Sequence, residues 1–127
     1  MKKLMVFLLA AVLLSACAKN NHREAVYMNI TAAEAKEIMD TREGYIILDV
    51  RTRAEYDEKH IPGAVLIPNT EIRARAEKEL PDKDQLILVY CRSGNRSKQA
   101  AEILVELGYT NIMEFGGIND WPYEVEK

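Results

Sequence analysis

Residues 86–97 read Leu86-Ile87-Leu88-Val89-Tyr90-Cys91-Arg92-Ser93-Gly94-Asn95-Arg96-Ser97. The first five residues form an apolar run typical of a strand that is covered on both faces, and a helical pattern starts at Ser97. A strand that turns directly into a helix leaves several backbone N–H groups unpaired at one point, and that point attracts anions. A thiol placed there is favoured as the thiolate, and Arg92 and Arg96 add positive charge beside it. The stretch therefore predicts a strand, a loop and a helix that present Cys91 as a nucleophile to an anionic substrate.

The spacing within this loop separates two chemistries. Tyrosine phosphatases and related cell-cycle phosphatases enclose a phosphate in a Cys-x5-Arg loop. Cys91 and Arg96 instead form a Cys-x4-Arg loop, which is one residue shorter. The shorter loop resembles that of the rhodanese (sulfurtransferase) family.

Two further segments resemble the same family. Residues 47–56 read Ile-Leu-Asp-Val-Arg-Thr-Arg-Ala-Glu-Tyr, and residues 60–64 read His-Ile-Pro-Gly-Ala, preceded by Lys59 where glycine is more usual. Residues 116–121 read Gly-Gly-Ile-Asn-Asp-Trp. The three motifs occur in order between about residues 30 and 121, and together they are far more specific than any one alone.

The remaining pattern alternates strands and helices. Apolar runs predict strands over residues 45–49, 64–67, 85–90 and 111–115, and helical patterns are expected over residues 31–39, from residue 52, over 71–80 and over 97–107. Thr31 with Glu34, and Thr52 with Glu55, have the spacing of capping boxes. We expect Asn69 to cap the third helix, and the fourth to end at residue 108, which is glycine.

Such alternation predicts a parallel α/β sheet whose functional groups lie at the carboxyl ends of its strands. Asp49, Arg51 and Cys91 all fall at predicted carboxyl ends. The resemblance implies a single rhodanese-like domain with a central parallel five-stranded sheet flanked by helices on both faces.

The resemblance also implies the reaction. The Cys91 thiolate would attack the outer sulfur of thiosulfate or a similar donor, become a persulfide, and pass that sulfur to a thiol or cyanide acceptor. An alternative is a persulfide carrier or binding module that delivers sulfur to a protein partner. A phosphatase or arsenate reductase on a related fold is a third class, which the loop length argues against.

Around Cys91 we expect six substrate-binding residues, namely Arg92, Ser93, Gly94, Asn95, Arg96 and Ser97. Backbone N–H groups of residues 93–97 would hold the persulfide, with Gly94 at positive φ so that the loop can curl. Arg92 is expected to recruit the anion at the mouth. Arg96 either binds substrate or ties the loop to an acidic neighbour such as Asp49.

Five other side chains receive supporting or structural roles. Asp49 and Arg51 are expected to brace the site, with Glu55 paired to Arg51. His60 is interpreted as a turn residue rather than an acid–base catalyst, and Trp121 is expected to pack the C-terminus onto the core.

The composition excludes several classes of function. The chain has 127 residues and a formal net charge of −3, which is not the balance of a nucleic-acid-binding protein. Its two cysteines are Cys17 and Cys91, and its two histidines, His22 and His60, lie far apart without companion ligands. We expect no internal disulfide, no metal, no cofactor and no nucleic-acid partner, and we expect a monomer.

The first residues resemble a bacterial lipoprotein signal. Lys2 and Lys3 precede an apolar stretch, residues 4–14, which is shorter than the ~20 residues that span a bilayer. Residues 14–17, Leu-Ser-Ala-Cys, resemble a lipobox, in which Cys17 would be lipidated and become the mature N-terminus.

The expected organisation is therefore a signal peptide over 1–16, a lipidated N-terminus and tether over 17–28, and the rhodanese domain over 29–127. The protein would be a lipid-anchored, periplasm-facing lipoprotein of the cell envelope. Ala18 after the cysteine favours the outer membrane by family analogy. The segment 16–18, Ala-Cys-Ala, also has the form of an ordinary signal-peptidase site.

Overall fold

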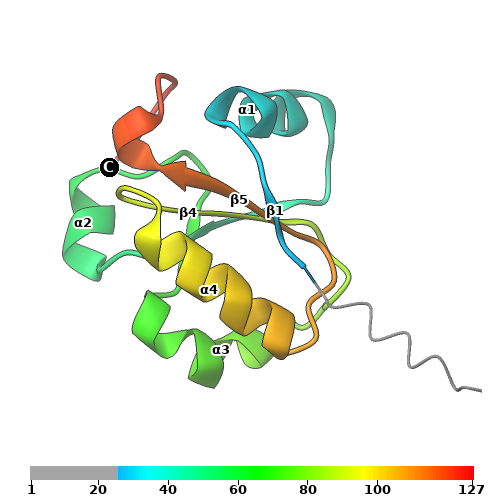
Figure 1. Cartoon of the computed structure of the whole chain (residues 1–127). Helices are drawn as coiled ribbons and strands as arrows, with labels where there is room; N and C mark the ends of the chain where they lie inside the picture. Colours follow the sequence, from blue (N-terminus) through cyan, green and yellow to red (C-terminus); the bar gives the residue numbers. More distant parts are fainter. Residues whose placement is uncertain (1–25) are drawn as a thin grey trace, which may run out of the picture.

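A parallel sheet forms the centre of the part of the chain that the computed structural model describes, residues 26–127 (Figure 1). In chain order its strands are β1 (Met28–Asn29), β2 (Ile46–Asp49), β3 (Val65–Leu66), β4 (Ile87–Cys91) and β5 (Ile112–Gly117). They lie in the order β1-β5-β4-β2-β3, and every neighbouring pair runs parallel. The expected five-stranded parallel sheet is confirmed.

Helices cover both faces of this sheet, as expected. The α-helices are α1 (Ala32–Thr41), α2 (Arg53–Glu58), α3 (Ile72–Glu79) and α4 (Asn95–Glu106), and two 3-10 turns are η1 (Asn69–Glu71) and η2 (Ile118–Asp120). α3 and α4 lie on one face and α1 on the other (Figure 1). Both expected capping boxes are present, because Thr31 and Thr52 accept hydrogen bonds from the N–H groups of Glu34 and Glu55 at the starts of α1 and α2.

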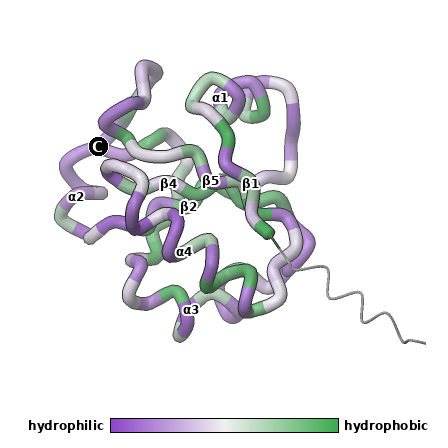
Figure 2. Tube along the Cα trace, in the orientation of Figure 1, coloured by the Kyte–Doolittle hydropathy of each residue, from purple (hydrophilic) through white to green (hydrophobic). Residues whose placement is uncertain are grey.

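The strand β4 is buried along its whole length. Ile87, Val89 and Cys91 pack towards α3 and α4, whereas Leu88 and Tyr90 pack towards α1 and the C-terminal segment. Side chains of a strand alternate between its two faces, so a strand covered on both sides is apolar throughout. Figure 2 shows this hydrophobic strand in the middle of the molecule, in contrast to the largely hydrophilic α2.

The expectation that Asn69 caps the third helix is wrong. Asn69 begins η1, α3 starts only at Ile72, and no side chain caps either element. The backbone N–H of Asn69 donates to the carbonyl of Val50, and its side-chain amide donates to Gln99. The first bond holds the chain against the residue after β2, the second links it to α4, and the chain enters α3 through the 3-10 turn η1.

Two other boundaries also differ. α4 begins at Asn95, two residues earlier than expected, because Gly94 makes the turn out of the loop. β1 is absent from the predicted strands, and Met28, which lies in the predicted tether, pairs with Met113 of β5. A two-residue strand is too short to produce a periodic pattern, so only its partner strand reveals it.

The carboxyl ends of the strands meet at one edge of the sheet. Asp49 ends β2, Cys91 ends β4, and Gly117 ends β5 beside Cys91. This edge therefore carries the predicted nucleophile. Over residues 26–127, none of the helices has both the length and the apolar character that crossing a membrane would require.

Candidate active site

Cys91 is the last residue of β4 and is 1% exposed. Its Sγ accepts a hydrogen bond from the backbone N–H of Gly94 at 3.0 Å. α4 starts at the next residue, Asn95, so the positive end of that helix faces the sulfur. This arrangement stabilises negative charge on Sγ, either as a thiolate or as a persulfide.

The loop curls around the sulfur because of two glycines. Gly94 has φ +109°, which confirms the expected positive φ. Gly117 of β5 lies against the loop so closely that a Cβ there would sit 2.0 Å from the Arg92 carbonyl oxygen. That carbonyl accepts a hydrogen bond from the N–H of Asn119 at 3.2 Å. The loop therefore packs against Gly117, which belongs to the third sequence motif, residues 116–121.

Ser97 connects the sulfur to a buried carboxylate. The Cys91 thiol lies in hydrogen-bond contact with the Ser97 hydroxyl at 3.2 Å, and that hydroxyl donates to Glu114 Oε1 at 2.6 Å. Glu114 is 2% exposed and also accepts from the N–H of Gly116 at 2.8 Å. The sequence reasoning missed Glu114. The signal was available, because a carboxylate inside a short buried strand rarely occurs without a partner.

Arg96 holds the loop to α2. Its guanidinium donates to both carboxylate oxygens of Glu55, at 2.6 and 2.9 Å. The expected pairing of Glu55 with Arg51 is therefore wrong, and the acidic partner of Arg96 is Glu55 rather than Asp49. The hydrogen bond from Arg96 is the main reason that the pKa of Glu55 falls from 4.5 to about 2. In return, Glu55 raises the pKa of Arg96, with a smaller contribution from Cys91.

This ion pair predicts an acid-sensitive contribution to stability. Because folding lowers the pKa of Glu55, its stabilisation is fully present above pH 4.5 and is lost as the pH falls towards 2. The pair is partly exposed, and after solvent screening we expect it to contribute about 1–2 kcal/mol. Urea unfolding should show that Glu55→Gln has a smaller free energy of unfolding than the wild type at pH 6. Most of this difference should be gone at pH 3. An equal difference in the free energy of unfolding at both pH values would contradict the stabilising role of this ion pair.

Asp49 and Arg51 form a buried ion pair next to the site. Arg51 is 3% exposed and Asp49 is fully buried, and the guanidinium donates to the carboxylate at 2.7 Å. Tyr90 also donates its hydroxyl to Asp49 at 2.7 Å, and Arg51 donates to the Lys59 carbonyl. Burial alone would lower the pKa of Arg51, but Asp49 raises it above its usual value. Burial and then Asp49 raise the pKa of Tyr90.

Lys59 takes part in the site through its backbone carbonyl, which accepts the hydrogen bond from Arg51. Lys59 has φ −166°, an extended conformation that any residue adopts, so this position does not require glycine. His60 follows, stacked on the ring of Tyr56 with its Nδ1 2.8 Å from the Tyr56 carbonyl. These contacts support the interpretation of His60 as a turn residue. Trp121 packs against Phe115, so the expected packing of the C-terminal segment is confirmed.

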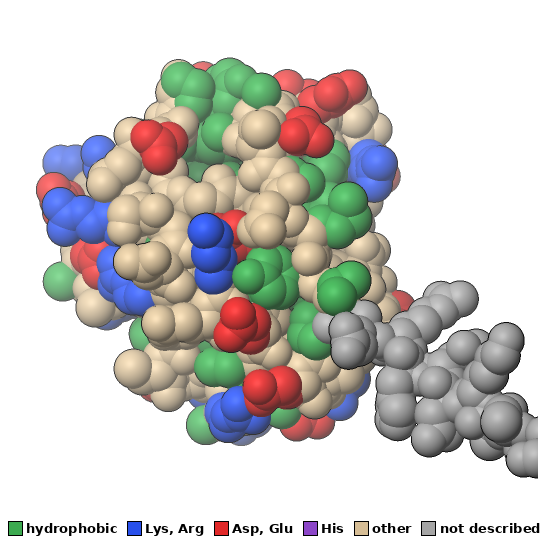
Figure 3. All heavy atoms as spheres, viewed as in Figure 1, with side chains coloured by type: hydrophobic (Ala, Val, Ile, Leu, Met, Phe, Trp, Pro, Cys, Tyr) green, Lys and Arg blue, Asp and Glu red, His purple; other side chains and the backbone are tan. Residues whose placement is uncertain are grey.

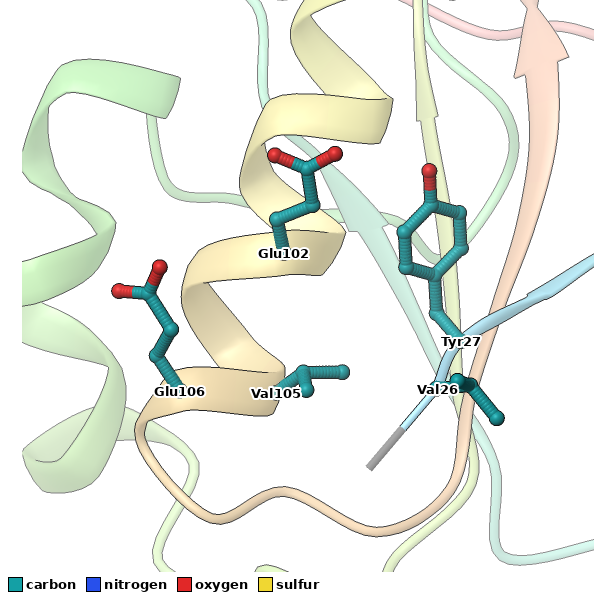
Figure 4. Close-up of a pocket in the computed structure, with 5 residues that line it drawn as sticks. All are labelled: Val26, Tyr27, Glu102, Val105 and Glu106. Atoms are coloured by element: carbon teal, nitrogen blue, oxygen red, sulfur yellow. The ribbon is translucent and has the colours of Figure 1, made fainter. Parts of the chain in front are cut away.

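A polar cavity of about 100 Å³ opens beside the loop. Its lining residues are Arg51, Glu55, Glu58, Lys59, Arg92, Ile118 and Asn119. Arg92 is exposed there and forms no ion pair within residues 26–127. A larger groove of about 350 Å³ lies at the far end of α4, between Tyr27 and Glu106 (Figure 4), and does not include the cysteine loop. Of these two cavities, only the small polar one is lined by a residue of the cysteine loop, Arg92.

Comparison with known proteins gives relatives that are named for sulfur chemistry. Thiosulfate sulfurtransferase PspE of Escherichia coli (strain K12) is 42% identical over 73 residues, which are 58% of this chain and 70% of PspE. Thiosulfate sulfurtransferase GlpE of Coxiella burnetii is 34% identical over 97 residues, covering 76% of this chain and 88% of GlpE. The putative sulfur carrier protein YrkF of Bacillus subtilis (strain 168) is 38% identical over 92 residues, covering 72% of this chain and 49% of YrkF.

Solved structures agree with these relatives. A rhodanese with anions from E. coli superimposes with a TM-score of 0.62 at 38% identity, over 65% of this chain and 98% of that one. The rhodanese-like domain of the Anabaena sp Alr3790 protein gives a TM-score of 0.73 at 28% identity, over 80% of each chain. The Rhodanese-like domain family matches residues 31–123, which contain the whole cysteine loop. This chain therefore belongs to the rhodanese-like domain family.

Proposed function

We propose that this protein is a sulfurtransferase that takes sulfane sulfur from thiosulfate and carries it as a persulfide on Cys91. The Cys91 thiolate attacks the outer sulfur of thiosulfate, an S–S bond forms, and the bond to sulfite breaks with its electron pair leaving on sulfite. A thiolate or cyanide acceptor then attacks the outer persulfide sulfur and releases the Cys91 thiolate. The two steps need no cofactor and no external oxidant.

One observation carries this proposal. Cys91 Sγ lies at the end of β4, 3.0 Å from the N–H of Gly94 at the start of α4. The sulfur thus sits where an anionic persulfide is stabilised by a backbone donor and by the helix end. The names of PspE and GlpE, both thiosulfate sulfurtransferases, support thiosulfate as the donor.

Sulfur-transfer assays with three donors test the proposal. Thiosulfate with cyanide should release thiocyanate, whereas a phosphate ester should not be hydrolysed. Mercaptopyruvate, run in parallel, separates thiosulfate-type from mercaptopyruvate-type specificity. Phosphate release without thiocyanate would instead favour a phosphatase.

A persulfide carrier that delivers sulfur to a protein partner is the second candidate. The match to YrkF, whose name describes a putative sulfur carrier, favours it. A carrier would load one sulfur from thiosulfate but release thiocyanate slowly over many cycles. Single-turnover loading and multiple-turnover release, measured on one sample, distinguish a carrier from an enzyme.

Among the loop residues, Arg92 is assigned to recruiting the anionic donor. Figure 3 shows Lys and Arg side chains gathered at the side of the molecule where α2 lies, with acidic side chains among them. Arg92 is exposed at the polar cavity next to Cys91. The backbone N–H groups of residues 93–97 hold the persulfide, and Arg96 keeps the loop in place through Glu55.

Arg92→Ala is expected to raise the KM for thiosulfate about fivefold, because an exposed charge-assisted contact contributes about 1 kcal/mol. The melting temperature should not change. Arg42→Ala is the matched control, since Arg42 is an exposed arginine directly after α1 that does not line the polar cavity. A thiosulfate KM that is equal in the two variants would refute the recruiting role.

We also propose that the protein is an envelope lipoprotein, with residues 1–16 removed and Cys17 lipidated. The lipobox-like residues 14–17 support this, and they lie outside the residues that the structure describes. The residues from Cys17 up to the first strand, β1, would form the lipidated start and tether. The wild type should partition with membranes in detergent-free extracts, and Cys17→Ser should remain uncleaved or become soluble. Recovery of mature wild-type protein in the soluble envelope fraction would refute lipidation.

A further inference from the structure

The buried carboxylate of Glu114 is not used by the sulfur transfer described above. Its Oε1 accepts from the Ser97 hydroxyl at 2.6 Å, and that hydroxyl lies 3.2 Å from Cys91 Sγ. The same hydroxyl also lies 3.0 Å from the Gly94 carbonyl and 3.3 Å from the Gly116 carbonyl. Of these acceptors the carboxylate is the nearest, so the hydrogen bonds run in one direction, from sulfur through hydroxyl to carboxylate.

The register of the sheet places Glu114 at this point. Val89 pairs with Glu114, but Cys91 pairs with Gly117, so β5 carries one extra residue between the two pairs. That extra residue follows Glu114, whereas Ile112, Met113 and Glu114 keep the regular alternation of strand side chains. Glu114 therefore lies on the same face of β5 as Ile112, the face that α4 covers, where it meets Ser97, and the other side chains of this strand are apolar.

We propose that Ser97 and Glu114 form a relay that takes the proton of the Cys91 thiol when Cys91 reacts and returns it when Cys91 is released. This inference rests on the proposed sulfur transfer. The thiol proton moves to Ser97 Oγ while the hydroxyl proton of Ser97 moves to Glu114 Oε1. The resulting thiolate attacks the outer sulfur of thiosulfate, and sulfite leaves. When an acceptor thiolate removes the outer sulfur, the proton returns to Cys91 along the same path.

The charge balance of the buried site explains why a proton relay would favour the reaction. In the proposed relay, the thiol keeps its proton until Cys91 reacts, and the carboxylate carries one negative charge. In the persulfide state, the sulfur carries that charge and the carboxyl group is neutral. The relay therefore moves a charge within the protein instead of adding a second one to a buried site, which is energetically costly.

Other ionisable groups face this chain from each neighbouring element. Cys91 helps to raise the pKa of Arg96 on α4, after the larger effect of Glu55, so these two groups interact electrostatically. Partial burial first, and then Glu102 and Glu114, raise the pKa of Tyr27. Glu102 is exposed on α4 and lies across the groove from Tyr27 (Figure 4). Glu102 makes none of the contacts of the relay, so it offers a control carboxylate.

The rate at which iodoacetamide alkylates Cys91, measured from pH 5 to 9, tests the relay. Glu114→Gln keeps an acceptor for Ser97 but cannot take a proton. We expect this variant to react about tenfold more slowly than the wild type at pH 6 and to approach it at high pH. Ser97→Ala should show the same change, and the double variant should be no slower than either single variant. Glu102→Gln should follow the wild type.

Two outcomes would overturn the relay. Faster alkylation of Glu114→Gln at pH 6 would mean that the carboxylate only repels the thiolate. A lower melting temperature with an unchanged pH profile would mean that Glu114 is structural. Alkylation needs no thiosulfate, so the relay is tested even if thiosulfate is the wrong donor. Loading of wild-type Cys91 with thiosulfate, followed by mass, tests the proposed function separately.

Discussion

Cys91→Ser is expected to abolish sulfur transfer and to leave the fold intact. In the wild type, excess thiosulfate should add ~32 Da, the mass of one sulfur, and cyanide should remove it. Serine cannot form a persulfide, so the variant should gain no mass and turn over about 10³-fold more slowly, or not at all. The two side chains differ little in size, and Gly94 N–H and Ser97 still offer hydrogen bonds to the new hydroxyl.

The chain provides its own control for this experiment. Cys17 is its other cysteine, and Cys17→Ser retains the proposed nucleophile. That variant should still gain one sulfur and lose it to cyanide. Intact-mass spectrometry of the two variants side by side decides the assignment. An adduct on Cys91→Ser, or none on Cys17→Ser, would mean that Cys91 is not the residue that carries sulfur.

Asp49→Ala should produce the largest loss of stability. It leaves the guanidinium of Arg51, 3% exposed, without its carboxylate, and it removes the acceptor of the Tyr90 hydroxyl. Removing one partner of a buried ion pair costs about 3–5 kcal/mol, which is a large part of the stability of a domain of this size. Activity should fall together with the folded fraction, because Asp49 makes no contact with Cys91 among its hydrogen bonds.

An exposed ion pair supplies the comparison. Arg53 and Asp57 pair at 3.3 Å on the surface of α2, with most of both side chains exposed. Asp57→Ala should change the free energy of unfolding by less than about 0.5 kcal/mol. Urea denaturation of both variants measures the difference. If Asp49→Ala melts normally but loses activity, Asp49 belongs to the reacting site rather than to its support.

Local sequence rules determined much of this protein. The alternation of apolar runs and helical patterns predicted the parallel sheet, and the spacing of Thr31 with Glu34 predicted the start of α1. The strand, loop and helix around Cys91 predicted where the nucleophile lies. These features depend on residues a few positions apart, whose geometry the backbone fixes by itself.

Only the tertiary structure decided which side chains meet across elements. Arg96 and Glu55 are 41 residues apart, and Ser97 and Glu114 are 17 apart. Sequence reasoning paired Glu55 with Arg51 and gave Glu114 no role, since each carboxylate had several cations or donors within plausible reach. The choice depends on how α2 and α4 pack at the sheet edge, and on the register that pairs Glu114 of β5 with Val89 of β4. Strand register and the packing of helices on the sheet depend on residues far apart in the chain, so these contacts appear only in the folded structure.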